Sequence, residues 1–166
     1  MNKYNQILYL KSSPKHFELE GSTKYLKLKC QRNSLLFLAT YSYHLILKRR
    51  LKALFPFTDS FYCVDSLNSA IEPDDVQKLD ENIRSLLTSK NEIEYVTVPK
   101  NDLISYFEEN KLNDKVFHLK RKFFSEDIEC IRFNGFFDLT YGIHYETNLK
   151  NLGDFKLVHY NNGFFI

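Results

Sequence analysis

The sequence is poor in the residues that give the clearest functional signals. It has three cysteines, one methionine and no tryptophan among 166 residues, and no two cysteines stand in a Cys-x-x-Cys spacing. This pattern argues against a zinc knuckle and predicts the reduced thiols of a cytoplasmic protein. The phosphate-binding pattern Gly-x-x-x-x-Gly-Lys-Ser/Thr is also missing. The segment therefore cannot bind ATP in the manner of a P-loop kinase.

Strong charge and long apolar runs are missing as well. The net charge is +2, which gives no argument for an obligatory nucleic-acid or membrane partner. The most apolar run, Leu35 to Leu47, is interrupted by Thr40, Ser42 and His44 and is too short to span a bilayer. Met1 to Tyr9 is polar and does not resemble a signal peptide. We therefore expect a cytoplasmic protein with no membrane partner.

The composition that remains is that of a globular protein, with 43% apolar and 27% charged residues. The length fits one domain with a small appendage. Residues 1–32 are predicted to be a short β appendage, with strands at Ile7–Leu10 and at Tyr25–Cys30, where apolar and polar residues alternate. Two strands are not stable alone. We expect them to pack against a main module at residues 33–166.

A long helix is predicted to open the main module. Asn33 or Ser34 can cap it, and Pro56 is expected to end it. Its predicted buried stripe is Leu36, Ala39, Tyr43, Leu47, Leu51 and Leu54. Shorter helices are expected from Pro73 and from Pro99–Asp102. Together they supply the helical part of an α+β fold.

The remaining segments predict strands. They are residues 61–64, 93–98, 116–119, 128–133, 136–140 and 154–160. Asn134-Gly135 is the strongest hairpin signal. The chain stops within the apolar Phe164–Ile166, which indicates either a longer parent protein or an unusually short edge strand. The predicted fold is α+β, with a long helix and shorter helices packed on a mostly antiparallel sheet.

Two Thr/His pairs form the candidate site. Thr40 and His44 lie four residues apart and share a helix face, while Thr140 and His144 lie in a glycine-containing loop. Asp138 joins them if its strand face points inward. Two imidazoles can transfer protons, and two hydroxyls can orient a water molecule. The set lacks the thiolates and carboxylates of a good zinc site, so no metal is expected. A purely structural role for each histidine stays open.

These motifs, Thr40-Tyr41-Ser42-Tyr43-His44 and Asp138-Leu139-Thr140-Tyr141-Gly142-Ile143-His144, resemble those of one protein family. It is the editing domain shared by threonyl-tRNA synthetase and alanyl-tRNA synthetase. That family carries His-x-x-x-His on a helix and Asp-hydrophobic-Cys-x-Gly-x-His in a loop. Thr40 and Thr140 replace the first histidine and the cysteine. The resemblance implies an editing-domain-like fold from Thr40 to Ile166 with a degenerate active site.

A second resemblance fits better. Ser34-Leu35-Leu36-Phe37-Leu38, Tyr141-Gly142 and Gly163-Phe164-Phe165-Ile166 are similar to the editing-like module that precedes the kinase domain of uridine-kinase-like proteins. This implies a non-catalytic accessory, regulatory or ligand-binding region of an ATP-dependent nucleoside kinase. Its partners would be the downstream kinase domain, which would use ATP and Mg, and an RNA or nucleotide ligand. No cofactor is expected in this segment.

Two other functions stay open. A free-standing hydrolase would deacylate mischarged tRNA, with His44 and His144 handling protons and Thr40 or Thr140 positioning water. A structural or dimerising module would use Phe164–Ile166 as an exposed strand edge.

Overall fold

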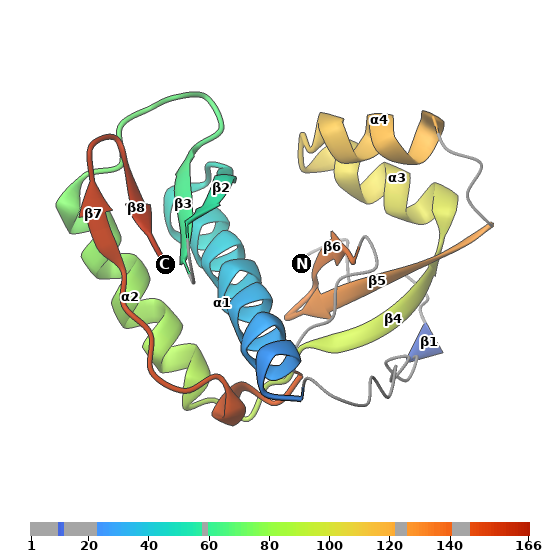
Figure 1. Ribbon diagram of the computed structural model, residues 1–166. Coiled ribbons are helices and arrows are strands. Elements are labelled where there is room, and N and C mark those ends of the chain that lie inside the picture. The colour runs from blue at the N-terminus through green and yellow to red at the C-terminus, as the bar shows by residue number, and fades with distance from the viewer. Residues whose placement is uncertain (1–9, 12–22, 58–59, 122–125, 141–146) are drawn as a thin grey trace. The chain divides into compact units, whose positions relative to one another are not determined.

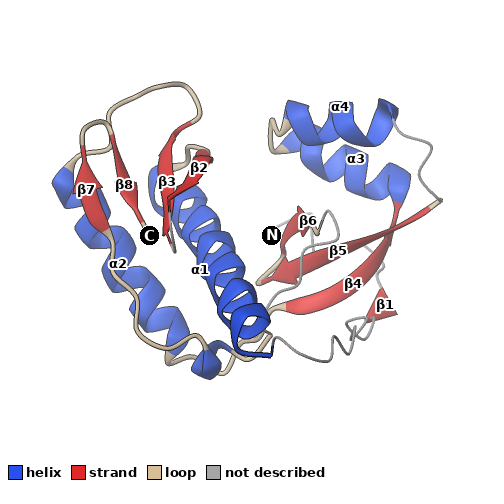
Figure 2. Ribbon diagram, in the orientation of Figure 1, coloured by secondary structure: helices blue, strands red, loops and turns tan. Residues whose placement is uncertain are grey.

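The computed structural model describes residues 10–11, 23–57, 60–121, 126–140 and 147–166. Within these ranges, helices and antiparallel sheets alternate along the chain (Figures 1 and 2). The elements are β1 (Leu10–Lys11), α1 (Thr23–Leu47), β2 (Leu51–Phe57), β3 (Ser60–Asp65), α2 (Pro73–Leu87), β4 (Glu94–Pro99), α3 (Lys100–Glu109), α4 (Asn113–Arg121), β5 (Asp127–Phe133), β6 (Phe136–Leu139), the 3₁₀ helix η2 (Leu149–Asn151), β7 (Val158–Tyr160) and β8 (Gly163–Phe165). The α+β class is confirmed.

The chain divides into two compact units, each built from two separate segments. Unit 1 consists of Met1–Glu18 and Ile93–Gly142, and unit 2 consists of Leu19–Glu92 and Ile143–Ile166. Residue 32, after which the sequence predicted a boundary, lies inside α1.

Unit 1 contains a four-stranded sheet in the order β1-β4-β5-β6, with every pairing antiparallel. The predicted hairpin at Asn134-Gly135 is confirmed, since Phe133 pairs with Phe136 across this two-residue turn. Asn134 has φ 49° and Gly135 has φ 81°. Both values belong to the left-handed region that a two-residue hairpin turn of type I′ requires and that Asn and Gly tolerate best.

Helices α3 and α4 cover one face of the unit 1 sheet (Figure 1). The apolar side chains Leu103, Tyr106 and Phe107 of α3 are all buried. The Phe137 N–H donates to the Tyr106 hydroxyl oxygen at 3.1 Å, and the two rings meet edge to face at 5.1 Å. The core is completed by Val96, Val98, Leu112, Val116, Leu119, Ile128, Cys130 and Leu139.

The predicted strand at 116–119 is wrong, because this segment belongs to α4. A run of four apolar residues does not distinguish a strand from a buried helix. The deciding pattern is wider: Leu112, Val116 and Leu119 are buried at helical spacing.

Unit 2 contains the second sheet, in the order β2-β3-β8-β7 and again antiparallel, with helices α1 and α2. The predicted helix from Pro73 is confirmed as α2. The Glu72 side chain and the Asp75 side chain each accept from the other residue's backbone N–H, which caps the helix start. Val76, Leu79 and Ile83 of α2 are buried.

A buried polar network joins α1, β3 and α2. The Tyr43 hydroxyl donates to Asp65 Oδ2 at 2.6 Å, and the Leu67 N–H donates to Asp65 Oδ1 at 2.8 Å. Arg49 Nε lies 3.6 Å from Asp65 Oδ2, and Arg49 Nη2 lies 3.7 Å from Asp75 Oδ2. Burial and the hydrogen bond to Asp65 hold the pKa of Tyr43 well above its usual value, so the phenol keeps its proton.

The strand predicted at Tyr25–Cys30 is wrong, because these residues lie within α1. Six alternating residues suggested a strand, but leucine and lysine are strong helix formers and the apolar positions are not all buried. Leu28 is 55% exposed. The alternation therefore did not mark a buried strand face.

The predicted end of the long helix is also wrong. α1 ends at Leu47, Lys48 takes φ 53°, and Leu51 and Leu54 lie on β2. Pro56 lies within β2, which is an edge strand of the unit 2 sheet. A proline is tolerated in an edge strand because its missing N–H can face solvent, where no hydrogen bond to a neighbouring strand is lost.

At the C-terminal end, two expectations are corrected. The strand predicted at 154–160 is limited to Val158–Tyr160. β8 pairs with β3 on one side and β7 on the other, so Phe164 lies in an interior strand rather than an edge. An exposed edge at Phe164–Ile166 is therefore wrong, and the dimerising module loses the feature that suggested it.

Candidate functional site

The helical half of the predicted site lies on α1 in unit 2. The Thr40 hydroxyl donates to the Leu36 carbonyl oxygen at 2.9 Å, so this hydrogen bond is made within the helix itself. His44 is partly buried. Burial, with a smaller effect from the positive charge of Lys48, holds the pKa of His44 below its usual range. The imidazole is therefore largely neutral at pH 7.

The loop half belongs to unit 1 as far as the structure describes it. Asp138 on β6 forms an ion pair with the largely buried Lys115 of α4, and its Oδ1 also accepts from the Leu139 N–H. Thr140 is buried. His144 lies outside the described residues. The four described site residues thus divide between the two units, Thr40 and His44 in one and Asp138 and Thr140 in the other.

Other reactive side chains are also held in structural roles. His159 places its Nε2 2.9 Å from the Ile71 carbonyl oxygen. Burial raises the pKa of the Cys63 and Cys130 thiols to about 12 in each case. Neither cysteine is a thiolate nucleophile near neutral pH.

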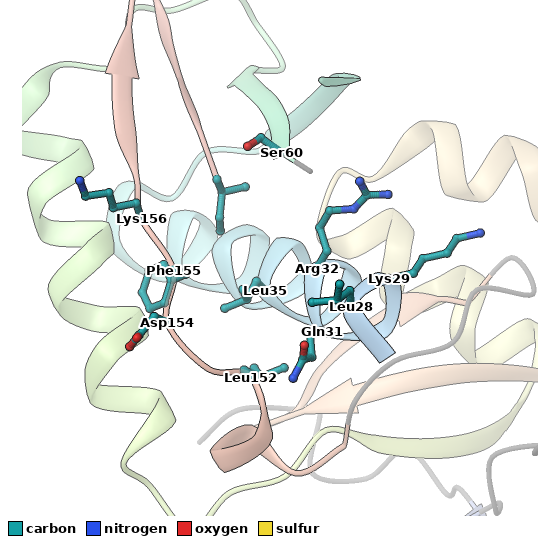
Figure 3. A pocket seen from close by; sticks show the side chains of 11 residues that line it. Leu28, Lys29, Gln31, Arg32, Leu35, Ser60, Leu152, Asp154, Phe155 and Lys156 are labelled. Carbon is teal, nitrogen blue, oxygen red and sulfur yellow. The ribbon is translucent and has the colours of Figure 1, made fainter. Parts of the chain in front are cut away.

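A pocket of about 350 Å³ lies entirely in unit 2, at the N-terminal half of α1. Its wall comes from α1, the start of β3, residues 152–156 and Ile166 (Figure 3). Leu35 and Phe155 lie near its middle, while the Arg32 guanidinium and the lysine ammonium groups lie further out (Figure 3). The volume falls within the range of small-molecule sites.

Contacts on both sides hold the pocket's walls in place. The Gln31 side-chain amide donates to the Asn151 carbonyl oxygen, which ties α1 to η2. Arg84 of α2 donates to the Phe155 carbonyl oxygen at 3.2 Å and lies 4.6 Å from the Phe155 ring centre. Ile166 exchanges two backbone hydrogen bonds with Phe61, of 2.9 and 3.1 Å. The pocket is therefore largely preformed.

The charged side chains of the pocket wall are mostly cationic. Lys29, Arg32 and Lys156 carry positive charge, and Asp154 is the one acidic side chain in the wall. The Arg32 guanidinium lies 4.7 Å from the centre of the Phe61 ring, which fixes its position by a cation–π contact. An apolar floor with a cationic rim suits a small molecule that has a flat body and an anionic group.

Sequence reasoning missed this pocket. Leu28 and Lys29 were predicted to lie on a strand, whereas they lie on α1, and Arg32 does not belong to a recognisable sequence motif. The pocket depends on the packing of segments about 120 residues apart, such as Gln31 and Asn151. A short sequence pattern does not encode such a contact.

The described residues lack two features that would indicate a particular function. Outside the gaps in the structure, no group of three or more His, Cys, Asp or Glu side chains is placed to hold a metal ion. In the same part of the chain, none of the helices is both long and apolar enough to cross a membrane.

Comparisons with known proteins add no relative. No protein-family model matches the chain, and no curated protein matches it at a significant level.

Proposed function

We propose that this chain is a ligand-binding accessory region of a uridine-kinase-like protein and that it catalyses no reaction itself. The preformed pocket of about 350 Å³ in unit 2 is the observation that carries the binding role. The resemblance of Ser34–Leu38 and Gly163–Ile166 to the module ahead of such kinase domains suggests the parent. In that protein, ATP and Mg belong to the downstream kinase domain.

The state of the predicted site residues supports binding rather than catalysis. The Thr40 hydroxyl is bonded to Leu36 within its own helix, and Asp138 is paired with Lys115. Neither group is arranged as an activated nucleophile, which needs a neighbouring general base. These contacts fit a degenerate editing site.

A uridine nucleotide is the ligand that this proposal favours. Its base is flat and partly apolar, which suits the pocket floor at Leu35 and Phe155, and its phosphate suits the cationic rim at Arg32. A nucleoside kinase produces such a nucleotide. Binding in this pocket would therefore make the kinase domain sensitive to the concentration of its product.

The proposal predicts saturable binding of uridine 5′-monophosphate to the chain, measured by isothermal titration calorimetry. Arg32→Gln should weaken binding by about tenfold to a hundredfold, since a hydrogen bond to a charged group is worth about 1.5–3 kcal/mol. The matched control is Lys27→Gln, which makes the same charge change on the same helix at an exposed residue outside the pocket wall. Its affinity should stay within about twofold of the parent's.

Two results would count against this prediction. One is the absence of saturable heat up to about 1 mM nucleotide. The dissociation constant would then be larger than that of ordinary metabolite sites. The other is equal weakening by Arg32→Gln and Lys27→Gln, which would mean that general charge rather than the pocket attracts the nucleotide.

A second function, a free-standing hydrolase that deacylates mischarged tRNA, is favoured by one observation. The lowered pKa of His44 leaves its imidazole neutral at pH 7, as a general base requires. In that case His144 would share the proton transfer, and the chain would act without a kinase domain. The size of the natural protein separates the two functions, since an accessory region belongs to a longer chain.

A further inference from the structure

Four aromatic rings form one cluster on the unit 2 sheet. Phe55 on β2, Tyr62 on β3, Phe165 on β8 and Tyr160 on β7 come from all four strands. Tyr62 is central, with ring centres 5.5 Å from Phe55, 5.0 Å from Phe165 and 6.1 Å from Tyr160. Tyr160 and Phe165 lie 5.7 Å apart. We call these four residues the aromatic platform.

Strand register places the platform on the face of the sheet that is turned away from the helices. The opposite face carries Cys63 and Phe164, both fully buried, and Asp65, which bonds to α1. Side chains alternate along a strand, so Tyr62 and Phe165 point the other way. Consistent with this, Phe55 is 47% exposed and Tyr160 is 54% exposed.

The Tyr62 ring lies flat across the sheet. Its hydroxyl donates to the Tyr160 carbonyl oxygen at 3.2 Å, one strand beyond β8. A Cβ built on Gly163 would lie 3.1 Å from that hydroxyl. The glycine therefore makes room for the Tyr62 hydroxyl, which reaches across β8 to β7.

We propose that the aromatic platform binds single-stranded RNA by stacking of unpaired bases. Exposed rings on an antiparallel sheet are suited to this task because every base has an aromatic face. The inference is independent of the nucleotide pocket, since none of the four platform residues lines it.

Charge on the platform's face fits a polyanionic partner. Lys52 pairs with Val64, so it projects from the same face as Tyr62, and it is exposed. Among the described residues of the four strands, Asp65 is the one carboxylate, and it is buried on the helix face. Phosphate approaching the rings thus meets a cation and no acidic strand residue.

Fluorescence anisotropy with a labelled single strand of about ten uridine nucleotides tests the proposal, because stacking sites cover about 4–16 nucleotides. Tyr160→Ala should weaken binding about tenfold, and Tyr160→Phe should restore it because the ring is kept. Lys52→Gln should lower the slope of log affinity against log salt by about 0.7. The same sequence annealed into a duplex should bind far more weakly.

Phe117→Ala is the matched control, because Phe117 on α4 is also 54% exposed and has a stacked cation, Arg121, at 3.9 Å. It should leave RNA affinity unchanged. The proposal is overturned by undetectable binding, by equal affinity for the duplex, or by equal weakening in Phe117→Ala. If Tyr160→Ala does not fold, as judged by circular dichroism, Phe55→Ala at the other end of the platform gives the same test.

Discussion

Replacing Asp65 by alanine is expected to destabilise the protein by about 3–5 kcal/mol, the range for removing one partner from a buried charged pair. The Asp65 side chain is fully buried and accepts from the Tyr43 hydroxyl and the Leu67 N–H. Its loss leaves a fully buried phenol without its acceptor. It also leaves Arg49 without one of its two carboxylates.

Urea denaturation followed by circular dichroism measures this effect. Tyr43→Phe should cost less, about 1–3 kcal/mol, because Asp65 keeps Leu67 and Arg49 as partners. Asp80→Ala is the matched control, since Asp80 pairs with Arg84 on the surface of α2, and its effect should be small. An Asp65→Ala variant as stable as Asp80→Ala would show that the buried network does not hold α1 and α2 on the sheet.

Gly163→Ala is expected to destabilise the protein by about 2–3 kcal/mol, in the upper part of the range for overpacking. The added Cβ would overlap the carbonyl oxygen of Cys63 and lie 3.0 Å from a methyl group of Val64. A backbone atom cannot rotate away as a side chain can, so β3 and β8 must separate at their Val64–Gly163 pair. The Tyr62 ring would also be displaced from the aromatic platform.

Gly153→Ala provides the contrast. Gly153 has φ 70° but nothing within 4 Å of an added Cβ, so the cost there is only conformational, about 1–2 kcal/mol. The midpoint temperature of thermal denaturation should therefore be lower for Gly163→Ala than for Gly153→Ala. A Gly163→Ala variant as stable as the parent would mean that the strands are spaced more widely than described, and the flat position of Tyr62 would lose its basis.

Local sequence signals were enough where one turn or one cap decides the structure. Asn134-Gly135 has the left-handed backbone that its turn needs, and Pro73 begins α2 as expected. Both signals depend on neighbouring residues alone. The same is true of α3, which begins within the predicted start at Pro99–Asp102.

Segments that depend on distant partners were less predictable. The alternation in Tyr25–Cys30 and the short apolar run Val116–Leu119 suggested strands, but both segments are helical in the folded chain. Pro56 looked like a helix terminator because the sequence does not reveal that β2 is an edge strand. In each case a short local pattern was outweighed by a wider pattern along the chain or by the position of the segment in the fold.

The candidate site shows the same limit. Sequence predicted one cleft that holds Thr40 and Asp138, and it did not reveal the partner of either side chain, which is Leu36 for Thr40 and Lys115 for Asp138. The pocket and the aromatic platform arise from strand order and from contacts between distant segments. Neither Tyr62 nor Arg32 stands in a recognisable motif.

The measurement that tests the central claim most directly is the size of the natural protein. An antibody raised against this chain would be used to blot extract from the cells that make it. An accessory region of a uridine-kinase-like protein predicts a band far above the 19.8 kDa of this chain. A single band near 19.8 kDa would contradict that account, and deacylation of mischarged tRNA, assayed in the parent and in His44→Ala, would become the leading hypothesis.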